Sequence, residues 1–138
     1  MISQGSYMQD LYSFHRVAVM LLRHIGLDAP QPADDQHAFM LTIDSRYSLS
    51  LSVIDATEWY LSANIGEVPN ITQNNELLQN ILKLNALTQL AYQPVISLNE
   101  KEEWVIWSRL PLSGTEDSQI IELFEYILKS ADYLLDLH

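Results

Sequence analysis

The sequence predicts a single α+β domain in which an antiparallel sheet packs against helices. Segments near both ends carry apolar residues three and four positions apart, the spacing of a helix face, whereas residues 39–65 carry them at every second position, the spacing of a strand face. The 138 residues, of which 48% are hydrophobic, are enough for one core, and no shift in composition divides them. We therefore expect one domain over residues 1–138 with the order helix, three strands, helix, two strands, helix.

The first helix is predicted over residues 6–25. Ser6 and Gln9 have the S-x-x-Q form of a capping box, and Gly26 can end the helix in the left-handed conformation. Residues 28–36 contain two prolines and are predicted to form a loop. The apolar stripe of the helix consists of Tyr7, Leu11, Phe14, Ala18, Leu21 and Ile25.

Three antiparallel strands are predicted between residues 39 and 65, because apolar and polar side chains alternate there. Turn-forming residues at 44–46 and 55–57 separate the strands. Alternation of this kind is typical of a sheet with one buried face. The side chains expected on that face are Phe39, Leu41, Ile43, Leu49, Leu51, Val53, Trp59, Leu61, Ala63 and Ile65.

The middle helix is predicted over residues 73–87 and has an unusually broad apolar surface. Leu77, Ile81, Leu84 and Leu87 fall on one face, and Leu78 and Leu82 extend that surface towards a second face. In so small a chain, this breadth favours burial of part of the helix against a second copy of the molecule. The pattern is equally compatible with the alternative that the protomer's own core buries the whole apolar surface of this helix.

Two more strands and a helix complete the predicted domain. The strands are expected over residues 92–98 and 104–110, joined by a charged turn, and residues 104–107 are apolar without alternation, as in a strand covered on both faces. A capping box at residues 113–116 precedes the last helix. The apolar stripe of that helix consists of Ile120, Phe124, Ile127, Ala131 and Leu134.

Charge and composition exclude several classes of partner. The chain has 18 acidic and 7 basic side chains, a net charge of -11, and the acidic residues are spread along it. Binding to a phosphate backbone or an anionic membrane needs a basic stripe, which the sequence lacks, so we expect no nucleic acid partner. Because the chain has no cysteine, residues 1–9 lack the features of a signal peptide and the apolar runs are too short to cross a membrane, we expect a cytoplasmic protein without membrane insertion.

No motif in the chain indicates catalysis or a cofactor. The 4 histidines lack the paired spacing of a metal site, the 4 glycines form no phosphate-binding loop, and no serine lies in G-x-S-x-G. Asp34, Asp35 and His37 could gather round a metal ion, although a solvated loop is the simpler interpretation. A small metal-dependent enzyme is thus one alternative function, while our prediction is a non-enzyme with no catalytic, cofactor-binding or metal-binding residue.

Nearly the whole chain resembles the class I type III secretion chaperones of Gram-negative bacteria, also called the Tir-chaperone or CesT-like family. The resemblance lies in the first helix, in residues 39–44 (FMLTID), in residues 82–85 (LKLN) and in residues 103–112 (EWVIWSRLPL), which lead into the final helix. Size, acidity and element order are similar as well. The conjunction of these features, more than any single motif, carries the resemblance.

The resemblance implies a homodimer that works by binding and not by chemistry. Its protomers meet largely through the middle helix and a neighbouring strand, and the dimer binds a segment near the N-terminus of a secreted virulence effector in extended form. The effector is thereby kept soluble and ready for export, with the secretion apparatus as a further partner and without ATP use by the chaperone. A peptide-binding adaptor of the same fold, unrelated to secretion, remains the other alternative.

Two sets of surface residues follow from the resemblance together with the apolar pattern. An extended client can add to a strand edge through main-chain hydrogen bonds while its apolar side chains fill grooves between the first helix and the sheet. For Val19, Leu22 and Trp107 a place in the core is an equal alternative. The residues predicted to bind the effector are Tyr12, Val19, Leu22, Met40, Tyr60 and Trp107. The residues predicted to form the dimer interface are Leu78, Leu82 and Asn85, with Trp104 or Ile106 from the strand.

Overall fold

The computed structural model describes residues 2–28, 31–67 and 73–136, with side chains described from Leu11 onward in the first helix. Its elements follow the predicted order of helix, three strands, helix, two strands, helix, which confirms the α+β class. They are α1 (Ile2–His24), β1 (Ala38–Ile43), β2 (Tyr47–Val53), β3 (Glu58–Gly66), α2 (Asn75–Leu82), η2 (Lys83–Asn85), β4 (Val95–Leu98), β5 (Trp104–Pro111) and α3 (Asp117–Asp136).

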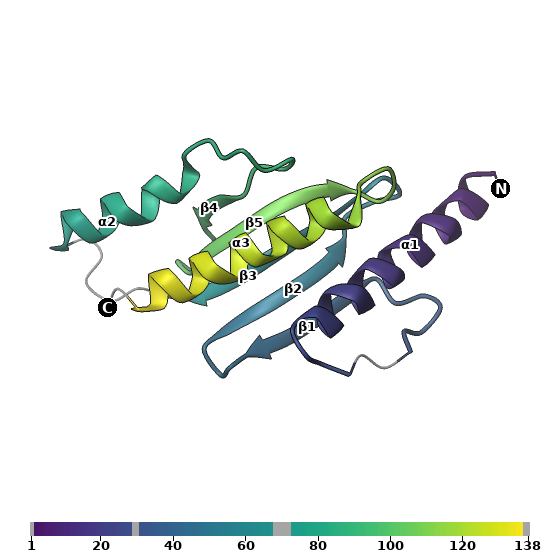
Figure 1. The fold of residues 1–138 in the computed structure, drawn as a ribbon, viewed down its shortest axis with the longest axis horizontal. Helices are drawn as coiled ribbons and strands as arrows, with labels where there is room; N and C mark the ends of the chain where they lie inside the picture. Colours follow the sequence, from purple (N-terminus) through teal and green to yellow (C-terminus); the bar gives the residue numbers. More distant parts are fainter. Residues whose placement is uncertain (1, 29–30, 68–72, 137–138) are drawn as a thin grey trace.

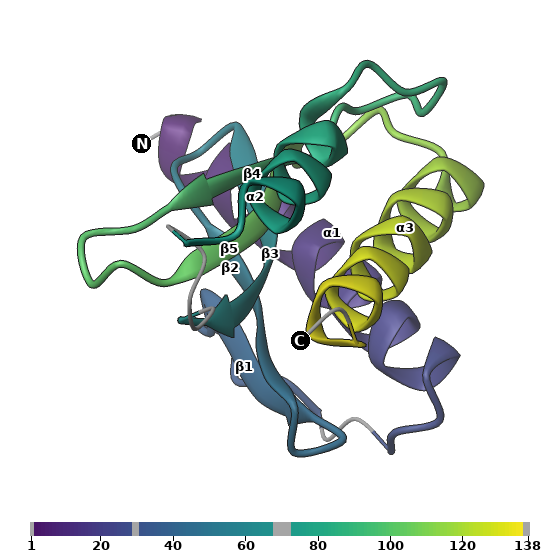
Figure 2. The same ribbon diagram turned by 90° about the vertical axis from the view of Figure 1, so that its left-hand side faces the viewer.

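The five strands form one antiparallel sheet in the order β1-β2-β3-β5-β4. β5 lies beside β3 because the chain leaves the sheet at α2 and returns along the far edge as β4 (Figure 1). Helices α1 and α3 cover the same face of the sheet, and the opposite face has no helix over it (Figure 2). The domain therefore has two layers, with β1 and β4 as the edges of the sheet.

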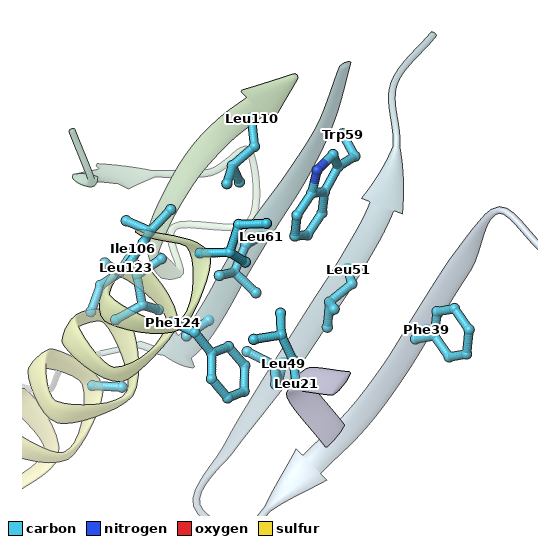
Figure 3. Close-up of a cluster of buried hydrophobic side chains, with 14 of the residues drawn as sticks. Leu21, Phe39, Leu49, Leu51, Trp59, Leu61, Ile106, Leu110, Leu123 and Phe124 are labelled. Atoms are coloured by element: carbon cyan, nitrogen blue, oxygen red, sulfur yellow. The ribbon is translucent and has the colours of Figure 1, made fainter. Parts of the chain in front are cut away.

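The core lies between this sheet and the two long helices. Alternate residues of β2 and β3, among them Leu49, Leu51 and Leu61, are fully buried and point towards Phe124 of α3 (Figure 3). Burying one such side chain contributes about 1.5–3 kcal/mol, so the alternation is what fixes the face of each strand. The apolar stripe predicted for α3 is buried throughout, and that of α1 is buried from Leu11 to Leu21.

The predicted start of the first helix is wrong. α1 begins at Ile2, so Ser6 lies within the helix and the capping box is not its N-terminus. None of residues 2–5 is a proline, which would have interrupted the helix, and the S-x-x-Q pattern alone does not stop a helix from beginning earlier. The side chain of Tyr7, assigned to the apolar stripe, lies outside the described residues.

The middle helix is shorter than predicted. The side chain of Asn74 accepts a hydrogen bond from the Leu77 amide and caps the N-terminus of α2, which ends at Leu82 and passes into the 3-10 turn η2. Leu77 is buried as predicted, but Leu87 lies beyond the turn with 91% of its surface exposed. A 3-10 turn has three residues per turn, so the helical stripe does not continue through it.

The second pair of strands differs from its prediction in two ways. β4 begins at Val95 and not at residue 92, because Pro94 cannot donate to a ladder. β5 is not covered on both faces, because Val105 and Trp107 are only half-buried and lie on the face that the helices leave open. The capping box at residues 113–116 precedes α3 without forming its first turn, since α3 begins at Asp117.

Candidate functional site

A groove of about 540 Å³ runs between α1 and the loop that leads into β1, and we call it the α1 groove. Helical spacing places Tyr12, Val19 and Arg23 on the wall formed by α1, since they recur at four and seven positions. Tyr12 is 59% exposed, whereas Val19 is half-buried. The lining consists of Tyr12, His15, Arg16, Val19, Met20 and Arg23 from α1 and Gln31, Pro32 and Asp34 from the loop.

His15 fixes the loop against α1. Its ring is 8% exposed, and Nε2 donates to the carbonyl oxygen of Gln36 at 2.7 Å; because a carbonyl oxygen only accepts, Nε2 carries the proton. The Gln36 side chain in turn donates to the carbonyl oxygen of Ala38, the first residue of β1, at 3.0 Å. The α1 groove is therefore tied directly to the beginning of the edge strand β1.

The α1 groove is a basic region of an acidic protein. Arg16 donates two hydrogen bonds of 3.0 Å to the carboxylate of Asp117 at the start of α3, and this pairing holds the pKa of Asp117 below its usual value. Arg23 has no ion pair among the described residues, and Asp34 is the acidic residue in the lining. An apolar floor with arginines along it suits an apolar peptide that carries some acidic or polar side chains.

A second hollow, of about 360 Å³, lies on the open face of the sheet, and we call it the sheet hollow. The indole Nε1 of Trp107 donates to the hydroxyl of Ser97 at 2.9 Å, which orients the ring across β4 and β5. Arg109 pairs with Glu58 at 3.0 Å at one end of the hollow. The lining consists of Ile54, Tyr60, Ser62, Val105, Trp107 and Arg109.

Met40 lies on the same face, at the β1 edge. The sheet register pairs Met40 with Ser50, Ser50 with Ser62, and Ser62 with Trp107, and cross-strand partners point to the same side of a sheet. Met40 is 76% exposed, an unusual exposure for an apolar side chain of a strand. The open face therefore offers apolar side chains at β1 and at β5, with a band of serines between them.

Four of the six predicted effector-binding residues line these two surfaces, and a fifth lies on the open face of the sheet outside the hollow. Tyr12 and Val19 line the α1 groove, Tyr60 and Trp107 line the sheet hollow, and Met40 lies at the edge of the open face. Leu22, in contrast, is 6% exposed and belongs to the core. Sequence reasoning missed several lining residues that the spacing from Tyr12 and Trp107 could have identified. They are Arg16, Met20, Arg23, Val105 and Arg109.

The residues predicted for the dimer interface are not all on the surface. Leu82 is 49% exposed and Leu78 is half-buried against the core, while Trp104 and Ile106 are buried at 9% and 2% exposure. Asn85 is exposed, but its side chain is hydrogen-bonded to the backbone of Ile96 in β4. Two further leucines of the same part of the chain, Leu87 and Leu98, are 91% and 51% exposed.

Two other kinds of feature, a metal-binding group and a membrane-spanning helix, are absent from the described residues. Among them, no three His, Asp or Glu side chains come together in a way that could hold a metal ion, so Asp34, Asp35 and His37 do not form such a group. No helix in the described part of the chain is long and apolar enough to cross a membrane.

Solved structures with a similar fold include proteins of type III secretion. The Yersinia pestis type III secretion chaperone SycH, solved with a stable fragment of YscM2, matches with a TM-score of 0.63 and 21% identity over 88% of this chain and 98% of that one. The HopA1-SchA chaperone-effector complex matches with a TM-score of 0.66 and 20% identity, over 94% of this chain and 97% of that one. The ExoU-SpcU complex of Pseudomonas aeruginosa matches with a TM-score of 0.66 and 16% identity, over 86% of this chain and 94% of that one. At such identities the likeness shows a common fold.

Sequence comparison assigns the family. No curated protein matches the chain. The family description of the Tir chaperone protein (CesT) family, however, matches residues 19–135, which run from the last turns of α1 almost to the end of α3. This range includes the whole lining of the sheet hollow, and the part of the α1 groove that Val19, Met20, Arg23 and the loop form. Since this match covers most of the 138 residues, the chain belongs to the Tir chaperone protein (CesT) family.

Proposed function

We propose that this protein is a bacterial cytoplasmic chaperone of type III secretion. It binds an extended segment near the N-terminus of one or more secreted effectors and keeps them soluble and competent for export. The observation that supports this best is the open strand edge β1 in a member of the CesT family, with the α1 groove near its start and the sheet hollow across the open face of the same sheet. Such binding needs no chemistry, in line with a family of chaperones, and we propose that the protein is not an enzyme.

The hydrogen-bond pattern of β1 shows what a client strand meets. The Val53 amide donates to the carbonyl oxygen of His37 at 2.9 Å, and antiparallel strands bond through every second residue. The odd-numbered residues of β1 therefore bond to β2, while Ala38, Met40 and Thr42 direct their backbone groups away from the sheet. An extended peptide can pair with these groups as an added strand.

The two apolar surfaces suit the side chains of such a strand. Successive side chains of a strand point to opposite faces. A client strand along β1 directs one set towards the helix side, where His15 lines the α1 groove and binds the Gln36 carbonyl oxygen, and the other set towards Met40 on the open face. From Met40 the client can continue over the serine band to the sheet hollow, where Tyr60 and Trp107 offer aromatic contacts.

The exposed leucines support a homodimer. About half or more of the surface of each of Leu82, Leu87 and Leu98 is exposed. A single exposed apolar side chain is ordinary, but several in one part of a chain indicate a surface that a partner covers. We propose that a second copy covers Leu82 and the partly buried Leu78, with Asn85 at this contact. In this arrangement Trp104 and Ile106 support the interface from the core beneath it.

The function is tested by capturing the client. The tagged chain is incubated with a lysate of the bacterium that encodes it, retained proteins are identified, and the bound segment is mapped by truncation. We expect a secreted effector that is no longer retained once its N-terminal region is removed. Retention through a folded C-terminal domain, or through proteins unrelated to secretion, contradicts the proposal and favours an adaptor of the same fold.

A further inference from the structure

The sheet has two edges, and the backbone groups on them differ in availability. β1 and β4 are the edge strands, and an edge normally presents a row of unpaired N–H and C=O groups that can bind another strand. If both edges were open, a client segment or another copy of the chain could pair at either one. Side chains of the segment between α2 and β4 decide which edge is available.

The outward-pointing residues of β4 follow from its pairing with β5. The Asn99 amide donates to the carbonyl oxygen of Glu103 at 2.9 Å, so the odd-numbered residues of this segment bond to β5. Pro94, Ile96 and Leu98 therefore direct their backbone groups towards the free edge. Ile96 is the central one of the three.

The side-chain amide of Asn85 occupies both outward groups of Ile96. Its Oδ1 accepts from the Ile96 amide at 2.5 Å, and its Nδ2 donates to the Ile96 carbonyl oxygen at 3.2 Å. A neighbouring strand makes the same pair of hydrogen bonds through its own backbone. Asn85 is held there by η2, which contacts β4 directly.

The outward groups of Pro94 are also closed. A proline has no amide hydrogen, and its carbonyl oxygen here accepts from Nε2 of Gln93 at 2.8 Å. Gln93 also donates to the Ala86 carbonyl oxygen at 3.0 Å and accepts from the Thr88 amide at 2.9 Å, which holds the preceding loop in place. Of these three residues, only Leu98, at the end of β4, has outward N–H and C=O groups that are free to pair.

The β1 edge has no such closure. The Ala38 carbonyl oxygen accepts from the Gln36 side chain at 3.0 Å, but the outward backbone groups of Met40 and Thr42 make no hydrogen bond within the described residues. Two consecutive outward residues supply four main-chain hydrogen bonds to an added strand.

We infer that Asn85, with Gln93 and Pro94, closes the β4 edge and thereby directs an incoming extended segment to β1. Asn85 is thus a specificity-determining residue that touches no client itself. The identity of the incoming segment as an effector rests on the proposed function, whereas the inequality of the two edges does not. A neutral Asn suits this role because its amide both donates and accepts, which neither Asp nor Ala can do.

The test uses the full chain and a synthetic peptide with the sequence of β2, Tyr47–Val53, as the probe. This sequence pairs with β1 within the sheet, so it is a suitable strand donor. In the isotope-labelled protein, we expect the peptide to shift the amide resonances of Met40 and Thr42 and to leave Ile96 unaffected. In Asn85→Ala the Ile96 amide should exchange with solvent about five- to tenfold faster, as loss of one hydrogen bond implies, and should now shift on peptide addition.

Matched variants distinguish a change in strand pairing at an edge from a general loss of folding. Gln79→Ala changes an exposed polar residue of α2 and should behave as the wild type. Asn85→Asp keeps the acceptor but loses the donor, so Ile96 stays partly protected even if Asn85→Ala folds poorly. Met40→Pro removes one outward N–H of β1 and should abolish the shifts there, whereas Met40→Ala should keep them.

The inference is overturned if the peptide shifts Ile96 in the wild type, if it shifts neither edge, or if Asn85→Ala leaves the β4 edge closed. These outcomes are distinct from failure of the proposed function. A chain that pairs the peptide at β1 but retains no effector contradicts the chaperone proposal alone. An effector segment that protects Ile96 and not Met40 from exchange contradicts the edge inference alone.

Discussion

Tyr47 shows how one residue couples the hairpin between β1 and β2 to α3. Its ring is 4% exposed, and burial, together with the nearby carboxylates of Asp132 and Asp44, raises the pKa of its phenol to about 12. The neighbouring Arg46 donates to Asp132 at 3.1 Å and to Asp136 at 2.6 Å, which holds the hairpin against the last turns of α3. The buried phenol therefore ionises only with difficulty while the domain is folded.

This gives a pH prediction for Tyr47→Phe. A pKa that is raised in the folded state stabilises the fold below the ordinary tyrosine value of 10.0, and this contribution is lost as the pH rises from there to about 12. We expect spectrophotometric titration to show one of the 7 tyrosines ionising near pH 12, and that late step to be missing in Tyr47→Phe. The free energy of unfolding of the variant should also fall less steeply than that of the wild type as the pH rises through the alkaline range. A full set of tyrosines titrating together near 10 contradicts the assignment.

Leu22 and Asn85 show at the residue scale what a sequence cannot specify. Both stand in helical segments next to apolar neighbours; Leu22 is predicted to bind the effector but lies in the core, whereas Asn85 stays a prediction for the dimer contact and has a bond to β4 that spacing does not reveal. The position of α1 against the sheet buries Leu22 at 6% exposure, and the turn of η2 places Asn85 against Ile96. Each outcome depends on how one element lies against another, which periodicity within one element does not contain.

At the scale of elements, the segment from α2 to β4 is a short helix, a 3-10 turn and a loop held together by side-chain amides. Asn74 caps the start of α2, Asn85 binds β4, and Gln93 binds the loop at Thr88 and Ala86. Only Leu77 and Ile81 of α2 are buried in the protomer. Leu77 and Ile81 anchor the element in the core and Leu78 packs against it, whereas Leu82 is exposed and available to a second copy.

The dimer prediction is tested on these leucines. Leu82→Asp places a charge where the proposed contact excludes water, and Leu87→Asp adds a charge at the exposed leucine that follows it in the same part of the chain. We therefore expect the double variant to be a monomer by light scattering while its far-ultraviolet spectrum is unchanged. Leu78→Asp is a poorer choice, because Leu78 also packs against the core. Tyr133→Asp, on α3 with 48% exposure, is the control and should remain a dimer. An unaltered dimer in the double variant contradicts the proposed interface.

At the scale of the whole molecule, the fold could be predicted because each element carries its own period. Alternation at Leu49, Leu51 and Leu61 and helical spacing at Phe124 and Ile127 specify which face of each element is buried, and the structure confirms these faces. The boundaries of α1 and α2 and the open face of β5 could not be predicted in the same way. They depend on tertiary contacts and on the order of strands in the sheet, which brings β5 beside β3.

The candidate surfaces could be predicted in part for the same reason. Tyr12 and Val19 share one face of a helix, so their common groove follows from spacing, but the opposite wall comes from a loop that spacing does not place. Tyr60 and Trp107 are far apart in sequence and meet only through the register of β3 with β5. The open β1 edge depends on strand order, so no local pattern of its residues indicates it.

The two surfaces and the β1 edge lead to a prediction about affinity for the captured effector segment. The few interface residues that each contribute about 2 kcal/mol or more are enriched in tyrosine and tryptophan. If Tyr12 and Trp107 are such residues, Tyr12→Ala and Trp107→Ala should each weaken binding about thirtyfold in calorimetry. If one continuous segment covers both surfaces, the double variant should lose about a thousandfold, because distant sites add. Tyr133→Ala removes an aromatic ring of similar exposure on α3 and should bind as the wild type does. Loss in only one of the two single variants would mean that the segment occupies the α1 groove or the sheet hollow alone, and equal loss in the control would contradict both as binding surfaces.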